Sequence, residues 1–371
     1  MRLESFIFFA FIFTALQSFI FHLFGLKRVR YTRTFADRAV FAGDETEMVE
    51  EIANNKWLPV PWIRLEASIS AHLRFGKQEN LHINRGLIWQ NHRSLFTLMP
   101  FTMIRRRHRI VCLRRGVYRL ATVSLTVGDL FGLSRQSRTI PLDAELFVYP
   151  QLLPLAQIPL PSHSWLGEVL ARRFVAPDPF LTAGVREYQS GDPLRMMHWK
   201  SFARTNVPHV RQLDFTADHR LLLYLNVDAE WQAKTTPLDP ERIERGIMYA
   251  ASIAHFTVSQ GLATGFVCNG QDTAAPGMPV RIEAGTGNAH MERLHKTFAR
   301  LDTVRSCSIE TLLQQERERG TTQTDILFMT TYLNEASADQ IRALKQLGNA
   351  VEVMLLGEHE SGGRDTDAGN A

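Results

Sequence analysis

Cysteine is scarce in this chain, and so are the short motifs that usually mark an enzyme. The 371 residues include three cysteines, Cys112, Cys268 and Cys307, which form no C-x-x-C pair. Three widely spaced cysteines argue against a disulfide framework or a cysteine-rich zinc site and fit a reducing compartment. A G-x-S-x-G nucleophile motif and a phosphate loop ending in Gly-Lys-Ser/Thr are also missing. Hydrolysis of nucleotides by this chain is therefore disfavoured.

Charge is missing from residues 5–26. None of these 22 residues is Asp, Glu, Lys or Arg, sixteen are apolar, and eight of those are Phe. A helix of this length would span ~33 Å, which matches a hydrocarbon core of ~30 Å. The run is longer than the apolar part of a signal peptide, and no small-x-small cleavage site follows it. We predict an uncleaved transmembrane anchor over residues 1–28, with residues 5–26 in the bilayer.

The basic residues after this segment predict its orientation. Lys27, Arg28, Arg30 and Arg33 outweigh Arg2 before it, so the positive-inside rule places the large C-terminal part in the cytoplasm. We expect a single-pass protein of the cell membrane. Residues 27–120 carry 18 basic and 8 acidic side chains, a net charge of +10. A peripheral sensor of anionic lipids is therefore one alternative function.

Residues 29–150 have the pattern of a β-sandwich, because short apolar stretches alternate with turn signals. A basic run at 105–109 is expected in a solvated hairpin or edge, and no aromatic platform for nucleic acid accompanies it. Residues 151–183 form a proline-rich connector, predicted to run extended over the surface with a short helix at 163–174. The predicted strands are 47–52, 62–69, 95–104, 110–113, 118–127 and 145–149.

Strands alternate with helices in residues 218–357, which predicts a parallel α/β sheet with helices on both faces. The first helix is expected to have Asp239 as its N-cap, Pro240 in its first turn and Gly261 at its end. A Ser337-x-x-Gln340 capping box should open the last helix. Residues 358–371 are expected to be a disordered tail. The predicted strands are 221–227, 262–267, 325–329 and 351–356, and the predicted helices are 289–301, 309–319 and 337–347.

Residues 184–217 contain the most distinctive stretch of the chain. A Ser190-Gly-Asp-Pro193 turn joins two segments in which many opposite charges lie beside two large aromatic residues. We expect a partly buried ion-pair network that fixes this segment on a domain face, and an interaction surface is the alternative. The residues concerned are Arg186, Glu187, Tyr188, Gly191, Asp192, Arg195, His198, Trp199, Lys200 and Arg204.

These residues, with Ala203, closely resemble the signature R-E-Y-x-x-G-D-x-x-R-x-I-H-W-K-x-x-A-R of the domain-of-unknown-function 58 family. Met197 stands where the family usually has Ile. The resemblance covers most of the chain. It implies a membrane-anchored protein with a β-sandwich followed by a von Willebrand A-like α/β domain. It also implies an association with a MoxR-type AAA+ ATPase, although the biochemical activity of the family is not established.

Von Willebrand A-like domains often hold a divalent cation through an Asp-x-Ser-x-Ser motif. Here the position reads Asp228-Ala-Glu-Trp-Gln232, which keeps the carboxylate and lacks both hydroxyls. Mg²⁺ needs several oxygen ligands, so Asp228 is only a weak metal candidate, and we expect it to bond the adjacent loop instead. No cofactor is predicted.

The leading hypothesis is a non-enzymatic scaffold or adaptor in envelope-related assembly, which engages a cytoplasmic protein, plausibly the MoxR-type ATPase. The enzymatic alternative is a hydrolase of envelope material, in which Glu187 or Asp192 would orient His198 as an acid–base group.

Overall fold

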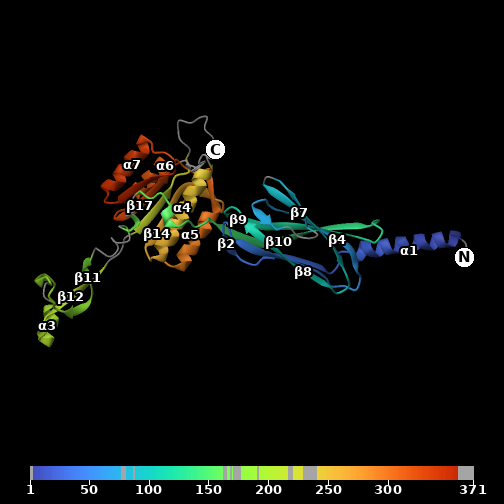
Figure 1. Cartoon of the computed structure of the whole chain (residues 1–371), viewed down its shortest axis with the longest axis horizontal. Helices are drawn as coiled ribbons and strands as arrows, with labels where there is room; N and C mark the ends of the chain where they lie inside the picture. Colours follow the sequence, from blue (N-terminus) through green and yellow to red (C-terminus); the bar gives the residue numbers. More distant parts are fainter. Residues whose placement is uncertain are drawn as a thin grey trace, which may run out of the picture. The chain divides into compact units, whose positions relative to one another are not determined.

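The computed structural model describes residues 3–76, 81–86, 88–161, 165–167, 169, 177–189, 192–215, 220–228 and 240–357. The chain divides into two compact units, Met1–Gln151 and Leu152–Ala371 (Figure 1). The predicted tail, 358–371, and the predicted N-cap, Asp239, lie outside the described residues.

The first element is the helix α1, Leu3–Phe24. Its residues Phe6–Phe24 are long and apolar enough to cross a membrane. Most of its phenylalanine side chains are exposed, whereas Phe21 is buried near the helix end. The hydroxyl of Thr14 donates to the carbonyl of Ala10 at 2.8 Å, so this polar group is satisfied inside the helix.

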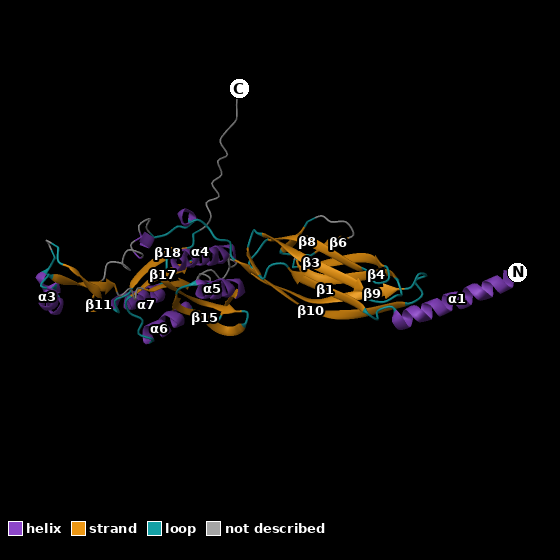
Figure 2. Ribbon diagram, turned by 90° about the horizontal axis from the view of Figure 1, so that it is seen from below, coloured by secondary structure: helices purple, strands orange, loops and turns teal. Residues whose placement is uncertain are grey.

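Two sheets pack face to face in the first unit and form a β-sandwich (Figure 2). Inward-facing side chains of both sheets share one buried cluster, for example Ile52 of one sheet with Ile63 and Leu125 of the other. Among the described strands of these two sheets, the strand Ala39–Phe41 pairs in parallel with the strand Arg135–Tyr149, and the other pairs are antiparallel. The first sheet has the order β1 (Val29–Phe35), β3 (Glu45–Asn54), β8 (Met103–Cys112), β5 (Leu73–Phe75). The second has the order β2 (Ala39–Phe41), β10 (Arg135–Tyr149), β9 (Gly116–Gly128), β4 (Val60–Ser70), β7 (Trp89–Leu98), β6 (Leu81–Arg85).

One prediction for the sandwich is wrong and another holds in part. Residues 95–104 are not one strand, because β7 ends at Leu98 and a turn with Phe101 at φ 52° precedes β8. The basic run 105–109 is not a hairpin, because it lies within β8 and pairs with β3. The predicted solvated edge is confirmed for the described residues, because β5 pairs with β8 at positions 110–112 and Arg105, Arg107 and Arg109 are exposed. Its cations are matched by carboxylates of that neighbour, as in the pair Arg105–Glu51 at 3.0 Å. Cross-strand pairing of opposite charges thus keeps this run in the sheet.

A buried polar cluster links β1, β3 and β8. Glu50 accepts hydrogen bonds from the Tyr31 hydroxyl at 2.6 Å and from the Arg33 guanidinium at 2.8 Å, both at Oε1. Its Oε2 lies 3.3 Å from Nε2 of His108. Arg33 is therefore paired inside the sandwich and is not available to lipid headgroups. In the folded protein the basic flank of α1 consists of Lys27, Arg28 and Arg30.

The second unit contains the predicted α/β sheet. Its strands have the order β15 (Ala275–Gly285), β14 (Ala263–Asp272), β13 (Arg220–Leu225), β17 (Thr324–Thr330), β18 (Ala350–Leu355), and β16 (Leu301–Arg305) pairs with β14. β14, β13, β17 and β18 are parallel, as predicted, whereas β15 and β16 are antiparallel additions that the sequence did not reveal. Pro276, Gly277 and Pro279 interrupt the apolar pattern of β15 and hide it.

Helices cover both faces of this sheet, as predicted (Figure 2). Leu221, Leu223 and Leu225 of β13 pack with α4 and α5, and Leu222 and Tyr224 pack with α6 and α7. This alternation explains why β13 is apolar throughout, because both of its faces are buried. The helices are α4 (Pro240–Ser259), α5 (Asn288–Arg300), α6 (Ile309–Glu318) and α7 (Glu335–Gln346).

Two helix boundaries test the capping predictions. Pro240 opens α4, and Gly261 follows its end with φ 78°, both as predicted. The prediction for α7 is wrong, because its N-cap is Asn334, whose side chain accepts from the Ser337 amide at 2.8 Å. Ser337 therefore lies in the first turn rather than at the cap. Asn is as favourable as Ser at an N-cap position. Asn334 precedes Ser337 by three positions, so the helix begins there.

The proline-rich connector does not run over the surface throughout. Ile158, Trp165, Leu166 and Val169 are buried in the core cluster that contains α4 and α5. Residues 165–167 and 169 are helical, inside the predicted 163–174 range, whose other residues lie outside those described. The apolar side chains of the connector favour burial despite its prolines, and its last residues, from Pro177, belong to the strand Pro177–Glu187.

Candidate functional site

The signature segment folds as a pair of antiparallel strands with a short helix between them. β11 (Pro177–Glu187) pairs with β12 (His209–Phe215), so that Arg186 lies opposite Val210 and Glu187 opposite His209. Between the strands lie the 3-10 turn η2 (Leu194–Met196) and the helix α3 (Trp199–Thr205). Of the predicted turn, Asp192 and the proline after it are described, whereas Gly191 and the serine before it lie outside the described residues.

Arg186 and Asp192 form the ion pair that the structure shows in this segment. Nη2 and Nη1 of Arg186 donate to Oδ1 and Oδ2 of Asp192 at 2.7 and 2.8 Å. Asp192 also accepts from the Gln189 amide at 2.9 Å. The hydrogen bonds from Arg186 and the Gln189 amide lower the pKa of Asp192, and the same pair raises the pKa of Arg186. Both oxygens of this carboxylate are therefore occupied in closing the turn.

His198 serves as the N-cap of α3. Its Nδ1 accepts a hydrogen bond from the Ser201 amide at 3.2 Å, and its own amide donates to the carbonyl of His209 at 2.8 Å. Nδ1 of His198 is therefore engaged as the acceptor at the N-terminus of α3. The His198 ring thus caps α3. The Asp192 oxygens, which were expected to orient this ring, are instead bonded to Arg186 and to the Gln189 amide. This geometry does not bring Asp192 to His198 as an acid–base pair, and the other predicted carboxylate, Glu187, lies opposite His209 in the strand pair.

Most side chains of the signature point to solvent. Trp199 is 64% exposed and Leu194 is 68% exposed. Trp199 makes an edge contact with Phe202, with ring centroids 6.3 Å apart. The exposed members of the signature are Arg186, Glu187, Arg195, Trp199, Lys200 and Arg204, whereas Tyr188, Asp192 and His198 are half-buried. The exposure of these side chains corrects the expectation of a partly buried network, because most of them lie in solvent.

A second group of polar side chains lies where the parallel pairing of β13 with β14 and β17 ends. Asn269 donates through Nδ2 to Oδ1 of Asn226 at 3.0 Å, and Asn226 donates through Nδ2 to the Thr330 hydroxyl at 3.0 Å. The Val227 amide donates to Oδ1 of Asn269 at 2.8 Å. These buried amides join three strand ends and fix the backbone that presents Asp228.

Asp228 is buried at this edge and connects it to α6. Its Oδ2 accepts from the Ile309 amide at 3.2 Å, and its Oδ1 lies 3.6 Å from Nε of Arg305. Burial raises the pKa of Asp228, against the opposing effects of the Ile309 amide and Arg305. Within the described residues no three His, Cys, Asp or Glu side chains lie close enough to share a metal ion. Residues 229–239, which follow Asp228, lie outside the described part.

Comparison with known proteins identifies the second unit. Residues 184–361 match the sequence profile of the family described as "Protein of unknown function DUF58". These residues belong to that family. The chain is also 30% identical over 143 residues to "Uncharacterized protein Rv1480" of Mycobacterium tuberculosis, which covers 36% of this chain and 43% of the relative. It is 20% identical over 357 residues to "Uncharacterized protein YeaD" of Bacillus subtilis, covering 96% of this chain and 83% of that protein.

The chain thus aligns with less than half the length of the mycobacterial relative. Among solved structures, it is similar to a non-cellulosomal cohesin of Archaeoglobus fulgidus, with a TM-score of 0.23 and 11% identity over 34% of this chain and 95% of the cohesin. It is also similar to a CARDB domain of Pyrococcus furiosus, with a TM-score of 0.18 and 13% identity over 33% of this chain and 97% of that domain. TM-scores this low do not establish a common fold.

The DUF58 match begins at Gly184, at the start of the signature, and contains both polar groups described above. Sequence reasoning found the signature and Asp228 but missed Asn226 and Asn269. Each of these amides follows a buried apolar run, Leu221–Leu225 and Phe266–Cys268, at the carboxyl end of a parallel strand. Their position after such a run could have identified the two asparagines from the sequence, because the carboxyl ends of parallel strands meet at one edge of the sheet.

Proposed function

We propose that this chain is a non-enzymatic adaptor, anchored in the cell membrane by α1, which recruits a cytoplasmic protein through the DUF58 signature segment. The observation that carries the proposal is Trp199, an exposed aromatic side chain flanked by Lys200 and, five positions on, by Arg204. Tryptophan, tyrosine and arginine are the residues most often decisive in protein interfaces. The cations favour a partner with an acidic surface.

The family resemblance supplies the identity of this partner within the proposal. A MoxR-type AAA+ ATPase, acting in envelope-related assembly, would bind the signature segment on the cytoplasmic side. The α/β unit, with its parallel strands and helices on both faces, would be the von Willebrand A-like domain that the resemblance implies. The occupied oxygens of Asp192 and the capping role of His198 favour this adaptor over the hydrolase.

Co-purification from membranes tests the proposal. The full chain is expressed with and without the ATPase, crosslinked gently and captured through a tag after Ala371. We expect the ATPase to be enriched with the native chain and lost with a Trp199→Ala, Lys200→Glu double variant. A matched control is Leu347→Ala, Lys345→Glu, which changes an exposed apolar residue and an exposed lysine after and within α7. Equal recovery with both double variants would contradict the proposal.

The orientation has a separate test. External protease on intact protoplasts should spare the chain beyond residue 33, because Lys27, Arg28 and Arg30 hold that side in the cytoplasm. Cleavage there would overturn the cytoplasmic assignment and the partnership with an ATPase together.

A further inference from the structure

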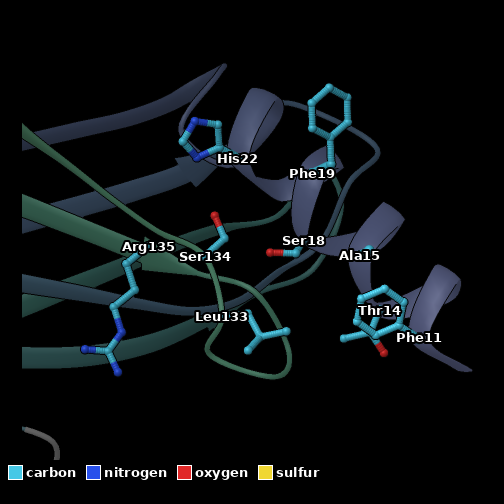
Figure 3. A pocket seen from close by; sticks show the side chains of 9 residues that line it. All are labelled: Phe11, Thr14, Ala15, Ser18, Phe19, His22, Leu133, Ser134 and Arg135. Carbon is cyan, nitrogen blue, oxygen red and sulfur yellow. The ribbon is translucent and has the colours of Figure 1, made fainter.

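The loop between β9 and β10 lies alongside the C-terminal half of α1, not only next to the residues that follow the helix. Leu133 and Ser134 line a groove of about 580 Å³ whose other wall includes Phe11, Thr14 and Ser18 of the helix. Figure 3 shows Leu133 and Ser134 facing the helix next to Ser18, and Arg135 directed away from it. Since α1 ends at Phe24, residues 18 and 11 lie ~9 and ~20 Å before that end along the helix axis. If α1 crosses the bilayer, this loop lies at hydrocarbon depth.

The composition of the loop fits that depth. Leu130, Phe131 and Leu133 are all strongly exposed, with Leu133 at 67%. Three such side chains at the tip of one hairpin would be unfavourable in water and favourable in lipid.

The polar groups of Asp129 and Ser134, at the two ends of the loop, bond to one another and to the neighbouring Gln17 and Trp62, which reduces the cost of placing them near lipid. Asp129 is fully buried, and its carboxylate accepts from the Ser134 amide at 3.1 Å and from Nε2 of Gln17 at 3.3 Å. The Asp129 amide donates to the carbonyl of Ser134 at 3.2 Å, and Nε1 of Trp62 donates to the carbonyl of Asp129 at 3.2 Å. The contact with Gln17 also explains a polar residue in the middle of an apolar helix.

Two further loops surround the end of α1. The Lys56 ammonium donates to the carbonyl of Lys27 at 3.1 Å, and the Phe101 amide donates to the carbonyl of Lys56 at 3.3 Å. These bonds place Trp57, which is 75% exposed, and Phe101, which is 72% exposed, beside residues that follow the helix. Aromatic side chains are enriched at that level of a membrane, and cations such as Lys27 and Arg28 suit its headgroups.

We propose that this end of the β-sandwich is a membrane-docking surface, made of residues 55–59, 99–102 and 129–134. The 129–134 loop enters the hydrocarbon beside the C-terminal half of α1, and Trp57 and Phe101 lie at the headgroups. The inference rests on the proposed anchoring by α1, which supplies the continuity between the helix and the lipid-facing loops. Docking would restrict how far the sandwich can tilt away from the bilayer.

Spin-label accessibility tests this surface in the full chain. Single cysteines replace Phe131, Phe101, Phe13 or Leu113 in a Cys307→Ser background, since Cys112 and Cys268 are buried. Each protein is labelled with a nitroxide and reconstituted into vesicles of phosphatidylcholine and phosphatidylglycerol. Collision rates are then measured with oxygen, which concentrates in hydrocarbon, and with a water-soluble nickel chelate. Leu113 is the matched control, because it is an exposed apolar residue near the opposite end of β9.

We expect the labels at positions 131 and 13 to collide preferentially with oxygen, with nickel collisions several-fold lower than at position 113. The label at position 101 should give an intermediate ratio. Nickel access at position 131 with oxygen preference at 13 would overturn the docking surface and leave the anchor intact. Nickel access at both positions would overturn the anchor as well. Shielding of position 131 from both reagents would show that protein, not lipid, covers the loop, and would also overturn the inference.

Discussion

Gln17 of α1 and Asp129 of the β9–β10 loop are joined by a hydrogen bond of 3.3 Å across 112 positions of sequence. The bond gives Nε2 of Gln17, in an otherwise apolar helix, an acceptor, and it gives one oxygen of a buried carboxylate a donor. It therefore ties the candidate membrane helix to the sandwich at a point inside the apolar segment, not only through the chain that follows Phe24.

Asp129→Ala should destabilise the first unit, because it leaves the Ser134 amide and the Gln17 amide group without their acceptor. Loss of a buried partner typically costs ~1–3 kcal/mol in the free energy of unfolding. Thermal unfolding of the full chain in detergent micelles checks this. Asp143→Ala is the control, because Asp143 is exposed on β10. A change of the same size in both variants would contradict the role given to Asp129.

The buried Glu50 cluster should make the sandwich sensitive to acid. Burial would raise the pKa of Glu50, but its hydrogen bond with His108 and the charge of Arg33 outweigh burial and lower it to about 2. A lowered carboxyl pKa contributes stability that is complete above the unfolded value of 4.5 and is lost as the pH falls toward 2. Unfolding midpoints measured between these limits should fall in the native chain and much less in Glu50→Gln.

Arg33→Met should be more damaging than the loss of a surface pair, because it leaves the Glu50 charge buried with fewer partners. The expected loss is ~3–5 kcal/mol in the free energy of unfolding. Arg93→Met, which breaks an exposed pair with Glu66, should cost at most ~1 kcal/mol. Denaturant unfolding measures both losses. Similar losses in the two variants would contradict the claim that the buried pair matters more to stability than the exposed pair.

His198 separates the adaptor from the hydrolase. His198→Asn keeps an oxygen that can accept from the Ser201 amide but removes the titratable ring, so we expect the variant to retain partner binding and cellular function. His198→Ala should weaken α3 through the lost cap. Complementation of a deletion strain checks both variants. Loss of function in the stable Asn variant would favour acid–base chemistry instead.

Asp228 should act through its hydrogen bond to α6 rather than through a cation. We expect Asp228→Ala to lower the unfolding temperature, because the Ile309 amide loses its acceptor, and Asp228→Asn to lower it less. Millimolar Mg²⁺ should shift the native chain and Asp228→Ala equally. Stabilisation of the native chain alone would reveal a metal site that includes this carboxylate.

The sequence predicted well those elements whose signals are local. The continuous apolar run of β13 predicted a strand buried on both faces, and Pro240 and Gly261 marked the ends of α4. Prediction failed where partners are distant in sequence. The basic residues of β8 resemble a solvated hairpin when read alone, because their carboxylate partners, such as Glu51, lie in another strand.

The candidate site was predictable in part for the same reason. The charges and aromatics of the signature stand close together in sequence and marked the segment without any structure. Their burial did not follow from their spacing, because it depends on what packs against them. The bidentate pair of Arg186 with Asp192 and the cap at His198 are therefore visible only in the folded chain.

Photocrosslinking from position 199 can decide whether the signature segment binds the proposed partner. A photoreactive amino acid replaces Trp199 in the full chain in living cells, and a matched variant carries it at Leu347, which is also exposed. We expect an adduct with an AAA+ ATPase subunit from position 199 that is missing from position 347 and is lost when Lys200 and Arg204 are changed to Glu. Equal adducts from the two positions, or no adduct from position 199 in cells that contain the ATPase, would contradict the adaptor role.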